Sequence, residues 1–423
     1  MNLAERDLKR VWHPCMQMKE FESTKLFDIK SAKGVWLEDF DGNRYIDAIS
    51  SWWVNLFGHS NEYLNSKLTE QLNSFAHIMT ANFTHEPMVK LSERLCKLTG
   101  LDKVFFADNG SSAIEVALKM SFQFHKNRGK VKNKFVCFKN SYHGETLGAL
   151  SIGDVGLYKS TFEELLLEVI VCDTPLDKTP EQVLSALHKI EATLDEQHND
   201  ICAIIIEPLV QCAGGMKMHS PEFITGLREL CDAFGILLIL DEIAVGFGRT
   251  GSMFAYQQAG ILPDILCLSK GITGGYMPLS VAVCTDKIYD AFYDEYESGK
   301  AFLHSHSYSG NALSCALANG VLDIFEQNDI FGQITTKSQQ ISHRLADIRG
   351  KTGIFETRQC GMIAAIELKN SDRIAPKVFE MAMKRGVFLR PIGNVIYTMP
   401  PFVIEKEEID LIFDVINECV GVL

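Results

Sequence analysis

Between residues 101 and 285, short runs of hydrophobic residues alternate with longer stretches of helical periodicity. The runs cover residues 103–107, 134–138, 202–206, 236–240, 265–268 and 280–284, and polar residues or glycines bound them. Continuous apolar runs of this length are typical of strands that are buried on both faces. Strands that alternate with helices predict a mostly parallel sheet covered by helices.

The two ends of the chain have a different pattern. Residues 34–37 and 45–47 flank Asp41-Gly42-Asn43, which is typical of a β-hairpin. After residue 320, helix-like and strand-like patterns mix again. We therefore predict an α/β fold with a large domain over residues 61–320 and a smaller α+β domain built from residues 1–60 and 321–423.

Composition and charge narrow the function classes. The chain has 423 residues, of which 46% are hydrophobic and 22% charged, an ordinary globular mixture with ample core. A net charge of −13 with scattered basic residues disfavours binding to nucleic acids and anionic membranes. The apolar runs are far shorter than the roughly twenty residues of a membrane helix. We expect a cytoplasmic protein without signal peptide or membrane span.

The cysteines and histidines do not follow the spacing of a metal site. Most of the 12 cysteines lie within apolar runs and none forms a CxxC pair, which indicates buried reduced thiols. There is no HExxH sequence and no Cys/His cluster with zinc spacing. We therefore expect no metal centre.

The first candidate for chemistry follows residues 103–107. Asn109, Gly110, Ser111 and Ser112 lie between this predicted strand and a helix-like stretch. Free backbone N–H groups and a hydroxyl at a helix N-terminus form an anion site. Taken alone, Ser111 or Ser112 is better explained as a helix cap.

Three further predicted strands end in an ionisable residue: Glu207, Asp241 and Lys270. Asp241 could keep a pyridine nitrogen protonated, although a metal-binding or capping acid is as compatible with its position. Lys270 could attack a carbonyl if burial lowers the amine pKa from about 10.4, whereas a lone lysine is more often a surface charge. Glu207 could hydrogen-bond within the site or support its loop.

Together these residues match the requirements of pyridoxal phosphate. The cofactor needs a phosphate cradle, a partner for its ring nitrogen and a Schiff-base amine. Ligands of open α/β sheets gather where strands end, which is where all three lie. No GxGxxG follows an early strand and no P-loop is present, so nucleotide and nicotinamide-dehydrogenase interpretations lose their usual support.

At this point the chain resembles the class III, fold type I pyridoxal-phosphate aminotransferases. The resemblance spans nearly the whole chain and is carried by residues 241–251 (DEIAVGFGRTG) and 268–275 (LSKGITGG). Further matching motifs are residues 12–14 (WHP), 50–53 (SSWW), 140–146 (NSYHGET), 386–391 (GVFLRP) and 396–401 (IYTMPP).

The resemblance implies roles for individual residues. Lys270 would be the catalytic Schiff-base lysine and proton shuttle, and Asp241 would pair with the ring nitrogen. The full set of implied cofactor-binding residues is Gly110, Ser111, Tyr142, Glu207, Asp241, Lys270, His306 and Ser307. The implied substrate-binding residues are Trp52, Trp53, Tyr142, Lys270, Ser305, Arg390 and Tyr397.

The resemblance also implies a homodimer with shared active sites. Residues 304–311 (HSHSYSGN) match a loop that family members extend into the neighbouring subunit, where Ser307 would contact the phosphate. Arg390 would bind a substrate carboxylate, and Trp52 would line the channel for a methylene chain. His143 is expected to be structural and not catalytic.

Two positions depart from the family pattern at the substrate entrance. Cys15 stands where the family often has a substrate-binding tyrosine, and a thiol lacks the phenol's reach and hydrogen bond. Ser305-His306-Ser307 replaces a more usual Gly-Pro-Thr. These departures concern substrate recognition and leave the cofactor chemistry unchanged.

The function implied by the resemblance is a ping-pong transamination in biotin biosynthesis. S-adenosylmethionine would donate an amino group to 8-amino-7-oxononanoate. Three alternatives remain at this stage: an ω-aminotransferase that uses lysine, ornithine or 4-aminobutyrate, a non-catalytic binding protein with this fold, and, more weakly, a dehydrogenase.

Overall fold

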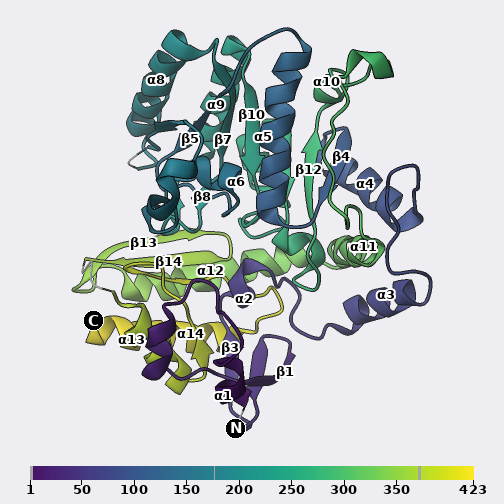
Figure 1. Cartoon of the computed structure of the whole chain (residues 1–423). Helices are drawn as coiled ribbons and strands as arrows, with labels where there is room; N and C mark the ends of the chain where they lie inside the picture. The colour runs from purple at the N-terminus through teal and green to yellow at the C-terminus, as the bar shows by residue number, and fades with distance from the viewer. Residues whose placement is uncertain (1–2, 176, 370–372) are drawn as a thin grey trace.

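A seven-stranded sheet forms the upper half of the molecule in Figure 1, a computed structural model that describes residues 3–175, 177–369 and 373–423. In spatial order its strands are β4 (Lys103–Ala107), β12 (Ser280–Cys284), β11 (Ile265–Leu268), β10 (Leu237–Asp241), β7 (Ile201–Ile206), β5 (Lys134–Phe138) and β6 (Ile170–Cys172). All six predicted strands are present, and their ends shift by at most one residue. β12 is antiparallel to its two neighbours, while the other pairs are parallel.

Both faces of this sheet are buried, which explains the continuous apolar runs. Alternate residues of each strand belong to different core clusters: Ile205 and Ile239 pack with α5 (Gly110–Asn127), whereas Ile204 and Leu238 pack with α9 (Pro221–Phe234). α8 (Pro180–Gln197) packs beside α9. The fold is therefore the predicted α/β arrangement with a central, mostly parallel sheet.

Smaller sheets fill the lower half of Figure 1. One consists of β13 (Ile354–Cys360), β14 (Ile363–Leu368) and β16 (Val395–Thr398). The other consists of β1 (Ile29–Lys33), β2 (Trp36–Asp39), β3 (Arg44–Asp47) and β15 (Val387–Phe388). The helices of this half are α12 (Ile330–Ile348), which packs against β13, and α13 (Ala375–Lys384) and α14 (Lys406–Val422), which pack against β15.

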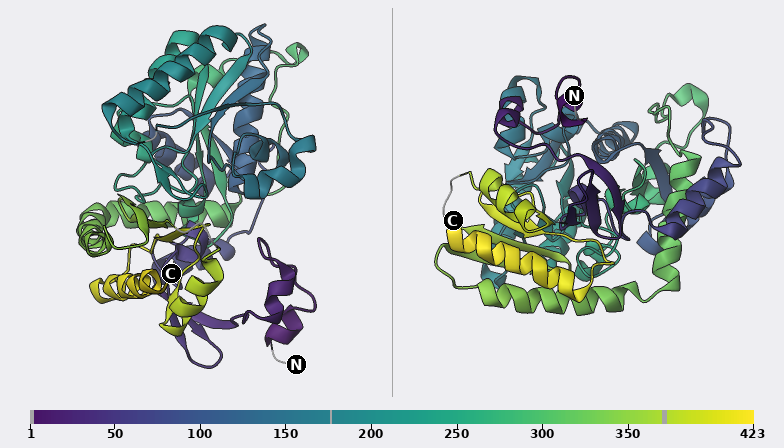
Figure 2. Two further views of the ribbon diagram at one scale, coloured as in Figure 1. Left: turned by 90° about the vertical axis from the view of Figure 1, so that its left-hand side faces the viewer. Right: turned by 90° about the horizontal axis from the view of Figure 1, so that it is seen from below.

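The second small sheet joins the two ends of the chain. β2 and β3 form the predicted antiparallel hairpin, and β15 pairs in parallel with β3. Figure 2 shows the resulting proximity of the purple N-terminal and yellow C-terminal segments. A smaller α+β part built from both ends is thus confirmed, while its boundaries at residues 60 and 320 stay predictions.

The remaining elements connect these sheets. α11 (Ala312–Gln327) packs against α3 (Glu62–Leu72) and α4 (Glu86–Thr99) at the right of Figure 1. The short elements are α1 (Leu3–Asp7), η1 (Met18–Glu22), α2 (Ser50–Trp53), α6 (Leu147–Ser151), α7 (Gly156–Lys159), η2 (Ser160–Leu165), β8 (Val210–Gln211), β9 (Lys217–Met218), η3 (Ala255–Ala259), η4 (Lys270–Thr273), α10 (Asp286–Tyr289) and η5 (Tyr296–Ser298). Within the described ranges, no helix is long and apolar enough to cross a membrane.

Candidate active site

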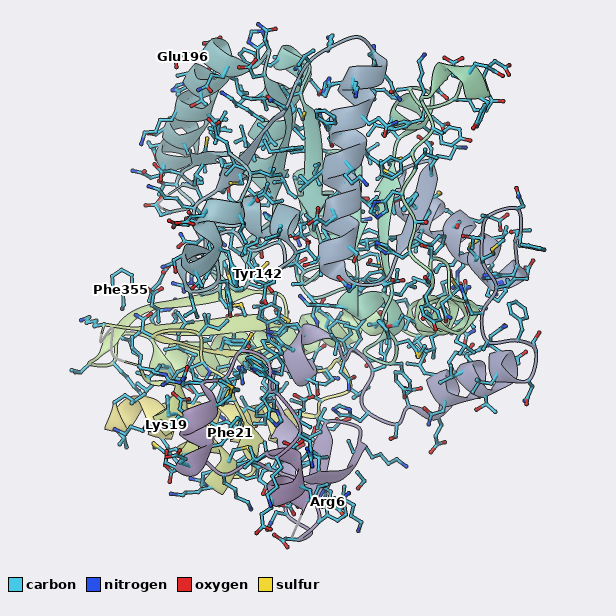
Figure 3. All side chains as sticks on the ribbon, viewed as in Figure 1. Arg6, Lys19, Phe21, Tyr142, Glu196 and Phe355 are labelled. Atoms are coloured by element: carbon cyan, nitrogen blue, oxygen red, sulfur yellow. The ribbon has the colours of Figure 1, made fainter. Side chains whose placement is uncertain are left out.

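A cavity of about 190 Å³ lies where the central strands end, at the boundary between the large sheet and the smaller sheets. Figure 3 labels Tyr142 at this boundary. The cavity is lined by Trp53, Gly110, Ser111, Tyr142, His143, Gly144, Glu207, Asp241, Ile243, Ala244, Val245, Ser269 and Lys270. The residues predicted from separate strand ends therefore meet in one place, as the topology of an open α/β sheet requires.

Lys270 begins η4, two residues beyond Leu268, the last residue of β11. Its backbone has a φ of 48°, an unusual left-handed conformation for a non-glycine residue that stores strain. The Nζ atom lies 4.7 Å from the centre of the Trp53 ring. Burial lowers the pKa of the Lys270 amine, so a larger fraction is in the unprotonated form that attacks a carbonyl.

Asp241 ends β10, and its carboxylate is held on both oxygens. Oδ1 accepts a hydrogen bond from the Ile243 backbone N–H at 3.0 Å, and Oδ2 lies 2.7 Å from His143 Nδ1. His143 Nε2 is buried and has no hydrogen-bond partner among the described residues. The sequence predicts a structural role for His143, and the structure places this residue in the cavity wall, in direct contact with Asp241.

Glu207 lies beyond the end of β7 and holds two loops together. Its carboxylate accepts hydrogen bonds from the backbone N–H groups of Tyr142, at 3.0 Å, and Cys212, at 3.1 Å. Burial raises the Glu207 pKa to about 7. The carboxylate thereby fixes Tyr142 at the edge of the cavity.

The N-terminus of α5 forms an open cradle in the cavity wall. Asn109 caps this 18-residue helix by accepting a hydrogen bond from the Ser112 N–H at 3.1 Å. A Cβ on Gly110 would come within 3.0 Å of Ile243, and one on Gly144 within 1.8 Å of Ser111 Oγ. Gly110 and Ser111 line the cavity, so the start of α5 offers it backbone N–H groups and the Ser111 hydroxyl, the donors that a phosphate needs.

The tryptophans of residues 50–53 differ in environment. Trp53 is 3% exposed, lines the cavity and donates a hydrogen bond from Nε1 to Tyr397 Oη at 3.1 Å. Trp52 is 38% exposed. The guanidinium carbon of Arg390 lies 4.9 Å from the centre of the Trp52 ring. Tyr397 is buried and lies behind Trp53.

Residues 50–53 all have positive φ, and buried polar groups hold this strained turn. Asp47 accepts hydrogen bonds from the Ser51 N–H and hydroxyl, at 2.8 and 2.6 Å. The guanidinium of Arg249, almost fully buried, donates to the carbonyls of Asn55 and Pro400, each at 2.8 Å. Burial lowers the Arg249 pKa to about 9. Arg249 lies within the 241–251 motif, but the sequence alone did not indicate that it supports this turn.

Several polar side chains surround the entrance beside Trp52. The Arg390 side chain donates a hydrogen bond to the Cys15 carbonyl at 3.3 Å, so these two predicted positions meet. The Tyr142 hydroxyl donates to Glu145 Oε1 at 2.9 Å. Burial, followed by the nearby Glu145 carboxylate, raises the pKa of the Cys15 thiol, while Arg390 opposes this shift. The entrance thus carries one cationic and one anionic group; sequence reasoning missed Glu145.

The loop of residues 304–311 lies outside this cavity. Ser305 and Ser307 are exposed, and His306 contacts Asp108, two residues before Gly110. None of Ser305, His306 and Ser307 lines the cavity of its own chain. Their predicted contact with a cofactor therefore requires a second subunit.

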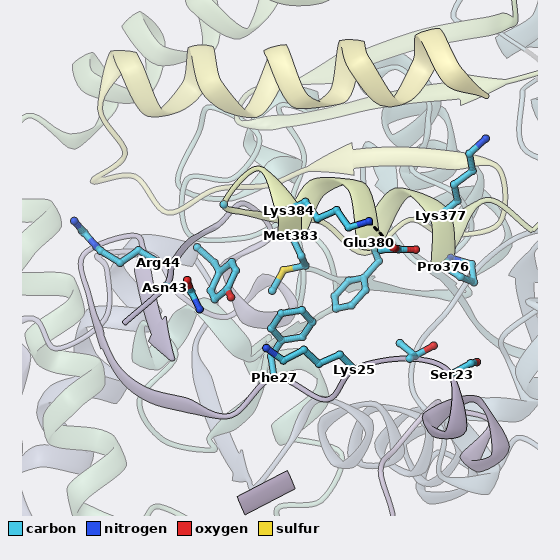
Figure 4. A pocket seen from close by; sticks show the side chains of 14 residues that line it. Ser23, Lys25, Phe27, Asn43, Arg44, Pro376, Lys377, Glu380, Met383 and Lys384 are labelled. Carbon is cyan, nitrogen blue, oxygen red and sulfur yellow. Dashed lines mark hydrogen bonds and ion pairs between the residues drawn. The ribbon is translucent and has the colours of Figure 1, made fainter. Parts of the chain in front are cut away.

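A larger hollow, of about 880 Å³, lies between residues 23–27 and α13 and contains none of the predicted site residues. Figure 4 shows its aromatic floor around Phe27 and the ion pair between Lys384 and Glu380. Within the described residues, no group of three or more His, Cys, Asp or Glu side chains is arranged to hold a metal ion.

Comparison with known proteins identifies the family. The family "Aminotransferase class-III" matches residues 18–420. The chain belongs to the class III aminotransferases.

This aminotransferase is similar to proteins with a more specific name. A Helicobacter pylori protein named adenosylmethionine-8-amino-7-oxononanoate aminotransferase is 48% identical, covering 96% of this chain and 95% of the relative. The crystal structure of the Methanocaldococcus jannaschii protein of the same name has a TM-score of 0.94 and 33% identity, covering 99% of this chain and 98% of the other. An amine transaminase from an uncultivated Pseudomonas species, solved in a PLP-bound form, has a TM-score of 0.92 and 30% identity, covering 97% and 98%.

The cofactor of this class is pyridoxal phosphate, and the cavity fits it. The cradle has glycines at two positions that line the cavity, Gly110 and Gly144, where a Cβ would crowd Ile243 and Ser111. Asp241 offers a carboxylate for a protonated ring nitrogen, and the unpaired His143 Nε2 is a polar atom left available beside it. Lys270 supplies the buried amine. The aminotransferase thus retains each group that the cofactor needs.

Proposed function

We propose that this aminotransferase transfers the amino group of S-adenosylmethionine to 8-amino-7-oxononanoate, forming 7,8-diaminononanoate in cytoplasmic biotin biosynthesis. Full-length similarity to relatives named for this reaction carries the proposal. The alternative is an ω-aminotransferase that uses another amine donor.

We assign roles in this reaction to four residues that line the cavity: Lys270, Asp241, Gly110 and Ser111. When bound, pyridoxal phosphate would supply an electron sink for the substrate carbon and a carrier for the amino group. Lys270 Nζ holds the cofactor and moves the proton at the substrate carbon, which its lowered pKa favours. Asp241 keeps the ring nitrogen protonated, and the first turn of α5 at Gly110 and Ser111 binds the phosphate.

The entrance suits a long keto acid. The Arg390 guanidinium presents a planar fork of donors that binds a carboxylate at two points. Its position 4.9 Å from the exposed Trp52 ring supports a substrate whose carboxylate meets Arg390 while its methylene chain lies along the tryptophan. Trp53 lines the inner end of this channel, and its ring centre lies 4.7 Å from Lys270 Nζ.

The same entrance suits a cationic donor. S-adenosylmethionine carries a positive sulfonium, and Glu145 provides a carboxylate within hydrogen-bond distance of the Tyr142 hydroxyl. Cys15 contributes its backbone carbonyl to Arg390 at this point, so the loss of the usual tyrosine leaves the Arg390 contact in place. Lysine is also cationic, which makes it the donor to compare.

We also propose a homodimer in which Ser307 contacts the phosphate in the partner's site. The exposure of Ser305 and Ser307, outside the cavity of their own chain, supports this arrangement. His306 is then a cofactor-side residue of the same loop.

A matrix of donors and acceptors tests the proposed reaction. Purified protein loaded with pyridoxal phosphate is assayed with S-adenosylmethionine, lysine, ornithine or 4-aminobutyrate against 8-amino-7-oxononanoate or 2-oxoglutarate. We expect product with the first donor and the keto acid. Product from 4-aminobutyrate and 2-oxoglutarate, with none from 8-amino-7-oxononanoate, would establish the alternative. Cofactor binding without turnover of any amine would establish a binding protein.

A further inference from the structure

Four polar side chains form a continuous chain of contacts at the base of the 304–311 loop. Lys119 Nζ, on α5, lies 2.9 Å from His304 Nδ1. His304 Nε2 lies 3.2 Å from His306 Nε2, and His306 Nδ1 lies 3.5 Å from Asp108 Oδ2. The chain therefore links α5 to the turn before the phosphate cradle through both loop histidines.

The contacts require one protonation state. A lysine ammonium only donates hydrogen bonds, so His304 Nδ1 must accept and His304 Nε2 must carry the proton. His306 Nε2 then accepts from His304, which leaves the proton of His306 on Nδ1, facing the Asp108 carboxylate. Both imidazoles are neutral in this arrangement, and each has a single allowed tautomer.

Protonation of either histidine removes an acceptor. A second proton on His304 would face the Lys119 ammonium, and one on His306 Nε2 would face the His304 N–H. Burial and the Lys119 charge lower the pKa of His304 below its ordinary value, which favours the neutral form. The Glu115 carboxylate, also on α5, opposes this shift.

Other groups hold the rest of the loop. His77 Nε2, before α4, lies 2.7 Å from the Ser307 carbonyl, and His85 Nε2, at the N-cap of α4, lies 2.8 Å from the Gly310 carbonyl. The His304 ring also packs against the rings of Phe105 and Phe302, with ring centres 6.1 and 5.8 Å apart. The loop backbone is therefore held at the Ser307 and Gly310 carbonyls, and the His306 N–H donates to Ser309 Oγ at 3.2 Å. The contacts from Lys119 to Asp108 hold the His304 and His306 side chains, and through them the segment that leads into Ser307.

We propose that Lys119, His304, His306 and Asp108 are positioning residues that hold Ser307 where it reaches the phosphate in the partner's site, and that they do so while both histidines are neutral. The inference rests on the shared site proposed above. Two links of the chain lie within hydrogen-bond distance, while the third, from His306 Nδ1 to Asp108 Oδ2 at 3.5 Å, is an ion-pair contact without a hydrogen bond.

Cofactor affinity of three lysine variants tests the chain. Lys119→Met removes the donor, Lys119→Arg keeps one, and Lys126→Met removes an exposed lysine from the same helix as a matched control. Because a hydrogen bond to a charged group is lost, we expect Lys119→Met to weaken pyridoxal phosphate binding about tenfold. Lys119→Arg restores the affinity and Lys126→Met leaves it unchanged.

Two further comparisons separate positioning from general damage. Pyridoxal lacks the phosphate, so its affinity should be equal in wild type and Lys119→Met. A double variant, His304→Gln with His306→Gln, keeps amide donors and acceptors that do not titrate near neutral pH. The ratio of its affinity for pyridoxal phosphate to that of wild type should rise as the pH is lowered from 8 to below the ordinary range of a histidine, since a proton added to His304 removes the acceptor that faces Lys119.

The outcomes distinguish this proposal from the proposed function. Equal losses for pyridoxal and pyridoxal phosphate in Lys119→Met, or a ratio that stays constant with pH, would overturn the positioning chain while leaving the shared site intact. A wild-type chain that binds pyridoxal and pyridoxal phosphate equally well would overturn the phosphate site itself, and this proposal with it.

Discussion

His143 Nδ1 lies 2.7 Å from Asp241 Oδ2, and both side chains are almost fully buried in the wall of the cavity. The imidazole N–H donates to the carboxylate and fixes its orientation, while the Ile243 N–H holds the other oxygen. His143, in the loop after β5, thus sets the orientation of the Asp241 carboxylate at the end of β10.

Removing this histidine should slow the reaction. In His143→Leu, Asp241 loses a charged hydrogen bond worth about 1.5–3 kcal/mol, so we expect kcat to fall about 10- to 100-fold with a smaller change in KM. Steady-state kinetics of His143→Leu beside His188→Leu, an exposed histidine on α8, would check this. A kcat equal to that of wild type would show that Asp241 needs no such partner.

Arg390 should govern the acceptor. Replacing it with alanine removes a bidentate charged contact to the carboxylate, so KM for 8-amino-7-oxononanoate should rise about 10- to 100-fold. Arg390→Lys should recover only part of this loss, because an ammonium lacks the planar fork. The control is Arg385→Ala, whose exposed side chain pairs with Glu418. An unchanged KM in Arg390→Ala would move the carboxylate site elsewhere.

The sequence predicted the sheet and the inner site because both follow local rules. Apolar runs marked six strands, and the residues after them, among them Asp241 and Lys270, meet at one edge by topology. β6 was missed because it has only three residues, Ile170–Cys172, too few for a pattern. The antiparallel direction of β12 depends on pairing that local pattern does not encode.

The entrance and its supports were harder to predict, since they join distant segments. Arg249 holds the carbonyl of Asn55, 194 positions away, and Arg390 reaches Cys15, 375 positions away. The positive φ of residues 50–53 follows from such contacts and not from the residues' own preferences. Glu145 has no mark in the sequence beyond its place in the 140–146 motif.

Glu207 should make the stability of the apoprotein depend on pH. Burial raises its pKa from 4.5 to about 7, so between these values the folded chain keeps a proton that the unfolded chain has released. This contribution to the free energy of unfolding amounts to about 3 kcal/mol. It is fully present below pH 4.5 and is lost as the pH rises to 7. The neutral amide of Glu207→Gln does not titrate in this pH range, so the variant does not lose this contribution.

Urea unfolding of wild type and Glu207→Gln at several pH values would measure this effect. The difference in unfolding free energy should shift by about 3 kcal/mol in favour of the variant between pH 4.5 and 7. Glu191→Gln, on the exposed surface of α8, should show no such shift. A constant difference across this range would mean that Glu207 is ionised throughout.

Mixed dimers should reveal the shared site. Lys270→Ala and Ser307→Ala are each defective as pure dimers, the second through a phosphate affinity reduced about tenfold. In a mixed dimer, one site would contain both mutations while the other would combine an intact Lys270 with the partner's intact Ser307. Tagged mixed dimers should therefore regain wild-type cofactor affinity at half of their sites. No gain over Ser307→Ala would place Ser307 in the site of its own chain.

The most direct test of the proposed transamination is the visible absorption spectrum of wild type and Lys270→Ala during both half-reactions. We expect wild type loaded with pyridoxal phosphate to show a yellow band that bleaches with S-adenosylmethionine and returns with 8-amino-7-oxononanoate, while Lys270→Ala shows no such cycle. A band that bleaches with lysine alone would keep the class and change the donor. A wild-type band that no amine bleaches would contradict the account.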